Sequence, residues 1–243
     1  MRGELALQIL EIARHGHHCG VVGGIGEARD EHLPVVFFAQ GEHGVMQAAV
    51  GTHAAGDGNG LWTRKGLRFM PDPDCKSRQA DHEDYRNSGY SRGHLAPAGD
   101  MKWDSVAILE SFYFTNCIPQ DEALNNGRWN QLEMKTRAWA RKYGKVYVVC
   151  GPVFINEDTL RIGHNGVAVP DMCFKALLIP KDKEYSAIAF LMYNGGERRT
   201  VEDCALTVDE LEAILGINLF CGLPDEIEKS VECKVVWEDW NKY

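Results

Sequence analysis

The chain has 243 residues, a formal net charge of −9 at pH 7, and 44% hydrophobic and 25% charged residues. This length and composition are those of a globular protein with one large domain or two small ones. No apolar run reaches the roughly 18 residues of a membrane-spanning helix, and Glu4, Gln8 and Glu11 interrupt the apolar stretch after Met1, unlike in a secretory signal peptide. We therefore expect no membrane partner.

The first 60 residues differ in composition from the rest of the chain. They hold 12 of the 25 glycines and 6 of the 9 histidines, but no lysine. They also contain no motif that points to a particular chemistry. We therefore divide the chain into an atypical Gly/His-rich segment at 1–60 and a domain at 61–243, and expect the segment to contribute little to the core of that domain.

Helical periodicity and end signals predict four helices after residue 100. They are expected at 104–114 with Asp104 as the N-cap, at 127–143 with a stop at Gly144, from the capping box Thr207-Val-Asp-Glu210 to Gly216, and from Pro224 onward. Apolar runs predict strands at 145–154, 174–179 and 186–193. Strands and helices do not alternate, so the fold class is α+β, with a largely antiparallel central sheet flanked by helices.

The eight cysteines include no C-x-x-C pair, which argues against a zinc ribbon or a thioredoxin-like site. Cys117, Cys150 and Cys173 lie in apolar, strand-like stretches. We interpret these three as small buried hydrophobic residues, although the even cysteine count also permits disulfides.

Positive charge is concentrated in one part of this acidic chain. Residues 85–145 hold nine Lys and Arg against six Asp and Glu, a net +3, so the remainder carries −12. Nucleic-acid affinity comes largely from neutralised phosphates. A locally basic segment in an acidic protein suits an enzyme that binds a polyanion and then releases it.

Two motifs carry the functional signal. The first is Ser91-Arg92-Gly93-His94-Leu95-Ala96-Pro97-Ala98, where we expect a loop histidine with a near-neutral pKa and room for a substrate backbone. The second begins with Thr115-Asn116-Cys117-Ile118-Pro119-Gln120 and continues through Leu124-Asn125-Asn126-Gly127-Arg128-Trp129 to Glu133 and Arg137. Taken separately, His94 reads as an exposed or capping residue, Asn125 as a helix cap, and Glu133 and Arg137 as a solvated helix face.

Together the two motifs resemble those of the DNA/RNA non-specific endonucleases, nucleases of the ββα-metal or His-Me finger class. The resemblance covers roughly residues 68–222 and implies a ββα-metal active-site element. It implies that His94 is the general base, that Asn125 is the sole direct protein ligand of Mg²⁺ (with Mn²⁺ as an alternative), and that Arg92, Glu133 and Arg137 complete the catalytic set. Arg92, Arg137 and Asn116 are expected at the substrate.

The implied reaction is hydrolysis of DNA and RNA with little sequence preference, giving 5′-phosphate ends. Phosphate contacts carry no base information, which agrees with this expectation. Bacterial relatives are commonly exported, so the resemblance also implies a secreted or periplasmic protein, although this chain shows no signal peptide.

Two departures from the family pattern set up an alternative function. Ser91 stands where the family has Asp, so a carboxylate that would help to order the loop or Arg92 is absent. We recognise none of the family's preceding strand and helix elements in residues 1–60. The alternative is a nucleic-acid-binding protein with impaired catalysis. On this basis Ser91→Asp is expected to increase activity.

Overall fold

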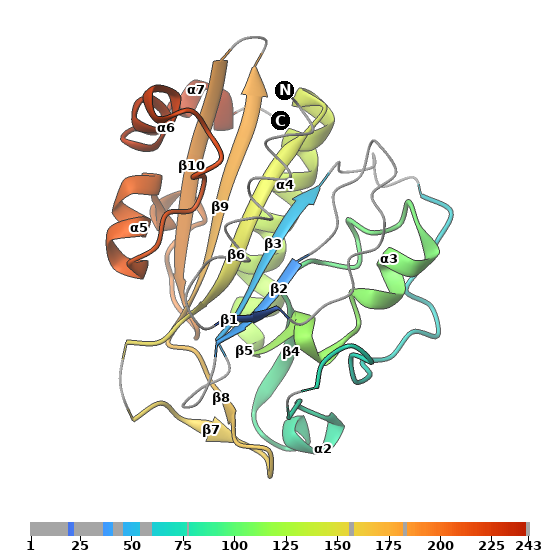
Figure 1. The fold of residues 1–243 in the computed structure, drawn as a ribbon. Coiled ribbons are helices and arrows are strands. Elements are labelled where there is room, and N and C mark those ends of the chain that lie inside the picture. The colour runs from blue at the N-terminus through green and yellow to red at the C-terminus, as the bar shows by residue number, and fades with distance from the viewer. Residues whose placement is uncertain are drawn as a thin grey trace.

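A seven-stranded antiparallel sheet forms the centre of the fold (Figure 1). The computed structural model describes the backbone of residues 19–21, 36–40 and 46–53, and residues 60–76, 78–155, 158–181 and 184–241 in full. In spatial order the strands are β1 (Cys19–Val21), β2 (Val36–Gln40), β3 (Met46–His53), β6 (Val146–Val153), β9 (Met172–Lys181), β10 (Glu184–Tyr193) and β11 (Ala205–Leu206).

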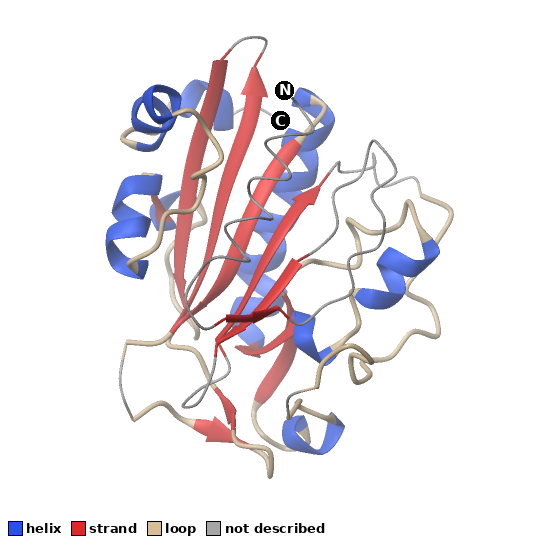
Figure 2. Cartoon of the chain, viewed as in Figure 1, coloured by secondary structure: helices blue, strands red, loops and turns tan. Residues whose placement is uncertain are grey.

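Helices cover both faces of this sheet (Figure 2). The helices are α2 (His82–Tyr85), α3 (Ser105–Glu110), α4 (Asn130–Tyr143), α5 (Val208–Leu215), α6 (Asp225–Glu232) and α7 (Trp237–Trp240), with short turns η1 (Phe114–Asn116), η2 (Leu124–Trp129) and η3 (Glu202–Cys204). Two further strand pairs lie outside the main sheet, β4 (Tyr90–His94) with β5 (Cys117–Asp121) and β7 (Arg161–Ile162) with β8 (Val167–Ala168). The α+β class and the antiparallel sheet are as predicted.

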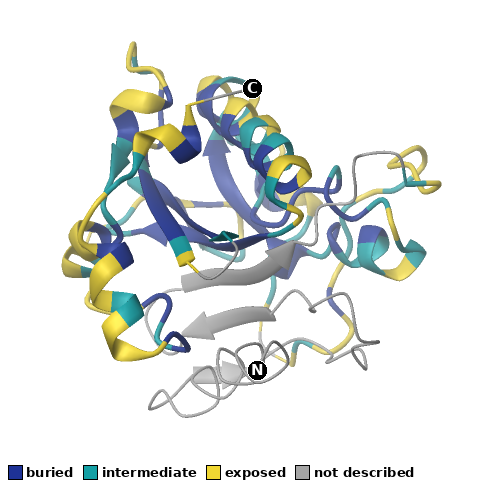
Figure 3. Ribbon diagram, turned by 90° about the horizontal axis from the view of Figure 1, so that it is seen from above, coloured by how far each residue is buried: buried dark blue, intermediate teal, exposed yellow. Residues whose placement is uncertain are grey.

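The strands alternate their side chains between two cores, as pleated strands do. On one face Leu132 and Trp139 of α4 pack against Val148 and Leu177. On the other face Val208 and Leu211 of α5 and Val231 of α6 pack against Phe174 and Ala176. Figure 3 shows α4 with a buried side toward the sheet and an exposed side toward solvent, the pattern of an amphipathic helix.

The helix ends follow the sequence signals. Asp104 caps α3, because its side chain accepts hydrogen bonds from the amides of Val106 and Ala107. Thr207 and Glu210 form the capping box of α5. Gly144 ends α4 in the left-handed conformation at φ 79°. Helix α3 ends earlier than expected, at Glu110. The helix predicted at 127–143 is regular only from Asn130, because Gly127 has a non-helical backbone (φ −99°, ψ −111°) that separates η2 from α4.

The predicted buried cysteines are confirmed. Cys117, Cys150 and Cys173 are buried, and Cys150, Cys173, Cys204, Cys221 and Cys233 are free thiols. Among the described residues, no helix is both long enough and apolar enough to cross a membrane.

Three strands in the first 60 residues were not expected from the sequence. Strand β3 pairs with β6 in the register Ala49↔Cys150, and β2 and β1 follow it outward. The rest of residues 1–59 lies outside the described residues. These strands join the segment to the main sheet, while the division of the chain at residue 60 stays a prediction.

Candidate active site

Both sequence motifs meet in one ββα element. Strands β4 and β5 pair antiparallel with His94 opposite Cys117 and Arg92 opposite Pro119, and η2 and α4 follow β5 directly. Gly93 is required here, since a Cβ at this position would overlap the side chain of Gln120, which is fully buried in β5. The sequence predicted a loop for residues 91–94. The structure corrects this, because the motif is a strand held by its pairing with β5.

His94 lies at the end of β4 among aromatic rings. Its ring centroid is 4.8 Å from that of Phe69 and 5.1 Å from that of Phe112, which it meets edge-on. Burial and, to a lesser extent, the positive charge of the Arg64 guanidinium together lower the pKa of His94 to about 4. The expected near-neutral pKa is therefore wrong for this structure. The imidazole is neutral at pH 7, and its buried Nε2 makes no hydrogen bond.

Asn116 supports the chain just after His94. Its side-chain oxygen accepts the amide N–H of Ala96 at 2.9 Å, and its amide nitrogen donates to the carbonyls of Ala96 at 2.8 Å and Ser111 at 2.7 Å. The residue is fully buried. The structure therefore does not place Asn116 where a substrate would contact it, and its hydrogen bonds fix the backbone that follows the histidine.

Arg92 shares the His94 side of β4, because residues two apart on a strand face the same way. Its guanidinium lies over the Tyr85 ring, 5.1 Å from the centroid, and Nη2 donates to the His82 carbonyl at 3.1 Å. Its buried Nε has no hydrogen-bond partner. The arginine is thus held by α2 and retains unused hydrogen-bond donors.

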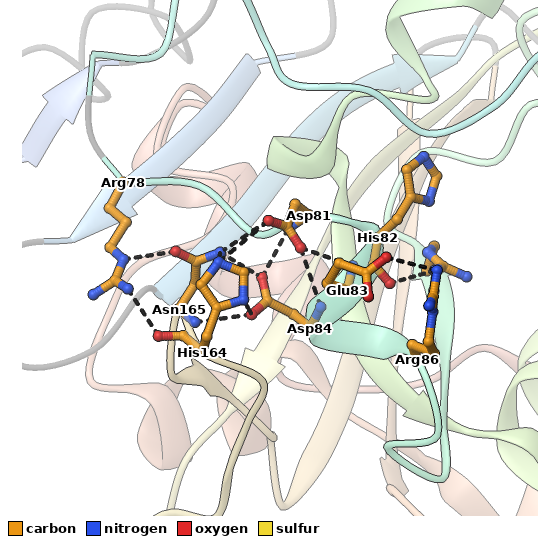
Figure 4. Close-up of polar contacts among 9 residues, drawn as sticks. Arg78, Asp81, His82, Glu83, Asp84, Arg86, His164 and Asn165 are labelled. Atoms are coloured by element: carbon orange, nitrogen blue, oxygen red, sulfur yellow. Dashed lines mark hydrogen bonds and ion pairs between the residues drawn. The ribbon is translucent and has the colours of Figure 1, made fainter.

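A network of hydrogen bonds and ion pairs connects the short helix α2 to residues 164 and 165 (Figure 4). Asp84 accepts hydrogen bonds from the Asn165 amide N–H at 2.8 Å and from the Asn165 side chain at 2.7 Å. Single ligand atoms of Asp81, Asp84 and His164 lie within 4.8 Å of one another, so this group has the donor types for a metal ion. Because the Asp84 oxygens are already engaged, we interpret the group as a clamp between α2 and the loop at 163–165.

Asn125 lies in η2 and does not cap a helix, contrary to the sequence interpretation. The turn begins after Ala123 without a side-chain cap, and Asn125 is half-buried. No hydrogen bond among the described residues uses its side chain, so the amide oxygen remains available as a ligand. In contrast, the adjacent Asn126 is exposed and contacts Glu122 at 3.5 Å.

Glu133 and Arg137 lie one turn apart on α4. The Arg137 Nη1 donates to Asp100 at 2.7 Å and lies 4.0 Å from the Glu133 carboxylate. Burial raises the pKa of Glu133 to about 7, while the positive charges of Lys175, Arg137 and Arg64 act in the opposite direction. An additional nearby cation would stabilise the ionised form of this half-buried carboxyl.

Two basic residues near the site were not among the predicted site residues. The positive charge of Arg64 lowers the pKa of both His94 and Glu133, which lie on different elements. Lys175 is 1% exposed, with Nζ 4.6 Å from the centroid of the Trp129 ring. No local pattern marks Arg64, whereas a lysine in the middle of the apolar β9 run is a sequence signal for a buried charge.

The fold and this arrangement define a ββα-metal nuclease element. The family model of the DNA/RNA non-specific endonucleases matches residues 46–226. The mitochondrial nuclease EXOG of Danio rerio is 38% identical over 175 residues, which are 66% of this chain and 51% of that protein. Endonuclease G of Bos taurus is 38% identical over 134 residues, 51% of this chain and 44% of that protein. The chain belongs to the DNA/RNA non-specific endonuclease family.

One further relative in sequence and one solved structure are also similar to this chain. The mitochondrial Nuclease 1 of Schizosaccharomyces pombe is 32% identical over 195 residues, 71% of this chain and 61% of that protein. A crystal structure of an EndoG/EndoGI complex has a chain with TM-score 0.70 and 23% identity, covering 90% of this chain and 94% of that one. The chain spans about half the length of the curated relatives it matches. All three relatives are named mitochondrial, and their names do not support the expected secreted or periplasmic location.

Proposed function

We propose that this protein is a metal-dependent nuclease that hydrolyses phosphodiester bonds in DNA and RNA, with His94 as general base and 5′-phosphate products. One observation carries the proposal. A neutral, half-buried imidazole lies in the same ββα element as an asparagine amide that no hydrogen bond among the described residues uses, within a chain of the non-specific endonuclease family.

His94 would accept the proton of the attacking water. Its aromatic surroundings and Arg64 keep the free imidazole unprotonated at neutral pH, as a base requires. A base with a pKa as low as about 4 is weak, but a phosphate bound beside the ring would raise that pKa by favouring the imidazolium. Substrate binding would therefore strengthen the base at the moment when it is needed.

The donor atoms fit a hard divalent cation. Asn125 offers a neutral amide oxygen, and the raised pKa of Glu133, caused by burial, marks a carboxyl that a nearby cation would stabilise in its ionised form. Asn125 would hold Mg²⁺ directly, and Glu133 would orient its water ligands. When bound, the ion supplies charge relief at phosphorus and at the leaving 3′-oxygen. Mn²⁺ accepts the same ligands.

Arg92 and Arg137 would hold the phosphate backbone. Arg92 retains unused donors, and Arg137 is oriented by its 2.7 Å bond to Asp100. We assign Asn116 a positioning role through the Ala96 backbone and add Arg64 as a third guanidinium at the site. None of these contacts reads a base edge, which supports low sequence selectivity and the use of both DNA and RNA.

The alternative, a binding protein with impaired catalysis, rested on Ser91 and on the family elements that we do not recognise in residues 1–60. In strand β4 the Ser91 side chain points to the opposite face from Arg92 and His94. A carboxylate at residue 91 would therefore not pair directly with Arg92. Purified protein should degrade plasmid DNA and total RNA in Mg²⁺ and stop when EDTA is added. Binding of both nucleic acids without any cleavage would instead support the impaired protein.

A further inference from the structure

A second acidic cluster lies between α5 and α6, away from the ββα element. Asp209 and Glu212 of α5 and Glu232 at the end of α6 each bring one carboxylate oxygen within 4.8 Å of the others. The two helices pack on the sheet face opposite to α4, since Val208 and Val231 belong to one core and Leu132 to the other. This cluster is therefore separate from the proposed catalytic residues.

Glu232 is the unusual member of this cluster. It is only 2% exposed, and its buried Oε1 has no hydrogen-bond partner. None of the ion pairs among the described residues includes it. A buried carboxylate without a donor or a counter-charge is strongly destabilising, so such groups are paired, metal-bound or protonated.

The surroundings of Glu232 are acidic. Burial and, to a lesser extent, the carboxylates of Glu212, Glu228 and Asp209 together raise its pKa to about 8. Two of these neighbours are fixed in place. Glu212 accepts the amide N–H of Leu219 at 2.6 Å, and Glu228 accepts the side-chain amide of Asn218 at 2.6 Å. Each carboxylate still has a second oxygen, so the carboxylates are pre-positioned and offer free lone pairs.

We propose that Asp209, Glu212 and Glu232 bind a hard divalent cation that links α5 to α6. The ligand set consists of carboxylate oxygens, which suits Ca²⁺ or Mg²⁺ rather than a thiolate- or imidazole-seeking ion. Ca²⁺ is favoured of the two, because it takes more carboxylate ligands and tolerates irregular geometry, whereas Mg²⁺ keeps most of its water. The ion would supply the positive charge that Glu232 lacks.

The test is the number of Ca²⁺ ions bound per chain, measured by equilibrium dialysis of the 243-residue chain. An Asn125→Ala background weakens binding at the proposed active site, so that it contributes less to the count. In this background Glu232→Gln should bind one ion fewer than Glu226→Gln, which removes the same charge from an exposed position of α6. Mg²⁺ in competition should displace Ca²⁺ only at a much higher concentration.

A thermal melt gives an independent readout. Ca²⁺ should raise the melting temperature of the Glu226→Gln protein and leave that of Glu232→Gln unchanged, while in EDTA the Glu232→Gln protein should melt no lower than Glu226→Gln. If Glu232→Gln does not fold, Asp209→Asn at the exposed rim replaces it, with at least a tenfold weaker Ca²⁺ affinity expected. Equal Ca²⁺ counts in variant and control, or no Ca²⁺ bound by either, would overturn the proposal and leave Glu232 as a protonated acid.

Discussion

The indole N–H of Trp129 donates to the backbone carbonyl of His94 at 3.3 Å. This bond joins the end of η2, which carries Asn125, to the end of β4, which carries the histidine. The same indole ring lies under the buried Lys175 ammonium of β9. Trp129 thus ties together the three elements whose relative positions the proposed reaction depends on, and explains why a tryptophan is fully buried at this point.

Asn125→Ala should raise the Mg²⁺ concentration needed for activity, because a site with one direct protein ligand has no second ligand to compensate. The matched control is Asn126→Ala, which removes the same side chain from the exposed neighbouring position. Rates measured against Mg²⁺ concentration should shift for Asn125→Ala only. Superimposable curves for the two variants would place the metal elsewhere.

Arg64→Met should raise the pKa of His94, since it removes one of the two causes that depress it. Burial should still keep the pKa below the ordinary value of about 6.5. The pKa can be followed directly by NMR titration of the ring in the substrate-free protein. An unchanged His94 titration in this variant would show that Arg64 does not face the imidazole.

The same titration has a consequence for stability. The unfolded chain takes up the His94 proton near pH 6.5, whereas the folded protein takes it up only at about 4. The stability gained from keeping the ring neutral is therefore complete above pH 6.5 and is lost as the pH falls through 4. Replacement of His94 by Phe, which cannot be protonated, should make urea unfolding less dependent on pH across this window. An equally steep dependence in both proteins would contradict the depressed pKa.

Ser91→Asp was expected from the family pattern to increase activity. The strand geometry predicts a smaller effect, because the new carboxylate would point away from Arg92 and His94. We expect less than about a threefold change in steady-state cleavage of one DNA substrate at equal Mg²⁺, well below the 10²-fold that misplacement of a catalytic group costs. A larger gain would mean that residue 91 orders the site by a route other than direct pairing with Arg92.

The register of β3 against β6 predicts that residues 46–53 are part of the folded sheet. Hydrogen exchange of the full chain should show their amides to be protected to a degree similar to those of β6. Fast exchange throughout residues 1–60, together with a protected β6, would instead support the composition-based division at residue 60.

Local signals in the sequence predicted the elements whose ends are encoded locally. Asp104, Thr207 and Gly144 act through their own backbone neighbours, so their caps can be read from the sequence alone. Strands β4 and β5 were missed because they are short and contain Gly and Pro, and their pairing is long-range. The change in composition near residue 60 did not predict strands β1 to β3.

The identity of the candidate site residues came from motif resemblance, whereas their environment required the fold. The depressed pKa of His94 depends on Phe69, Phe112 and Arg64, which reach the ring from separate parts of the chain. Likewise, the buried side-chain amide of Asn116 forms hydrogen bonds with the backbone of Ala96 and Ser111, which are 20 and 5 residues away in the sequence. No local pattern specifies such contacts, so a near-neutral histidine and a substrate-facing asparagine were the natural expectations.

Cleavage by His94→Ala tests the central claim most directly. Turnover of a single DNA substrate in Mg²⁺ should fall by roughly 10²–10⁴, the usual contribution of a general base. Nucleic-acid binding, measured separately in EDTA, should stay close to that of the unchanged protein, because the phosphate contacts are assigned to the arginines. A variant that cleaves at the original rate, or one that loses binding with no separate loss of turnover, would contradict the assignment of His94 as the base.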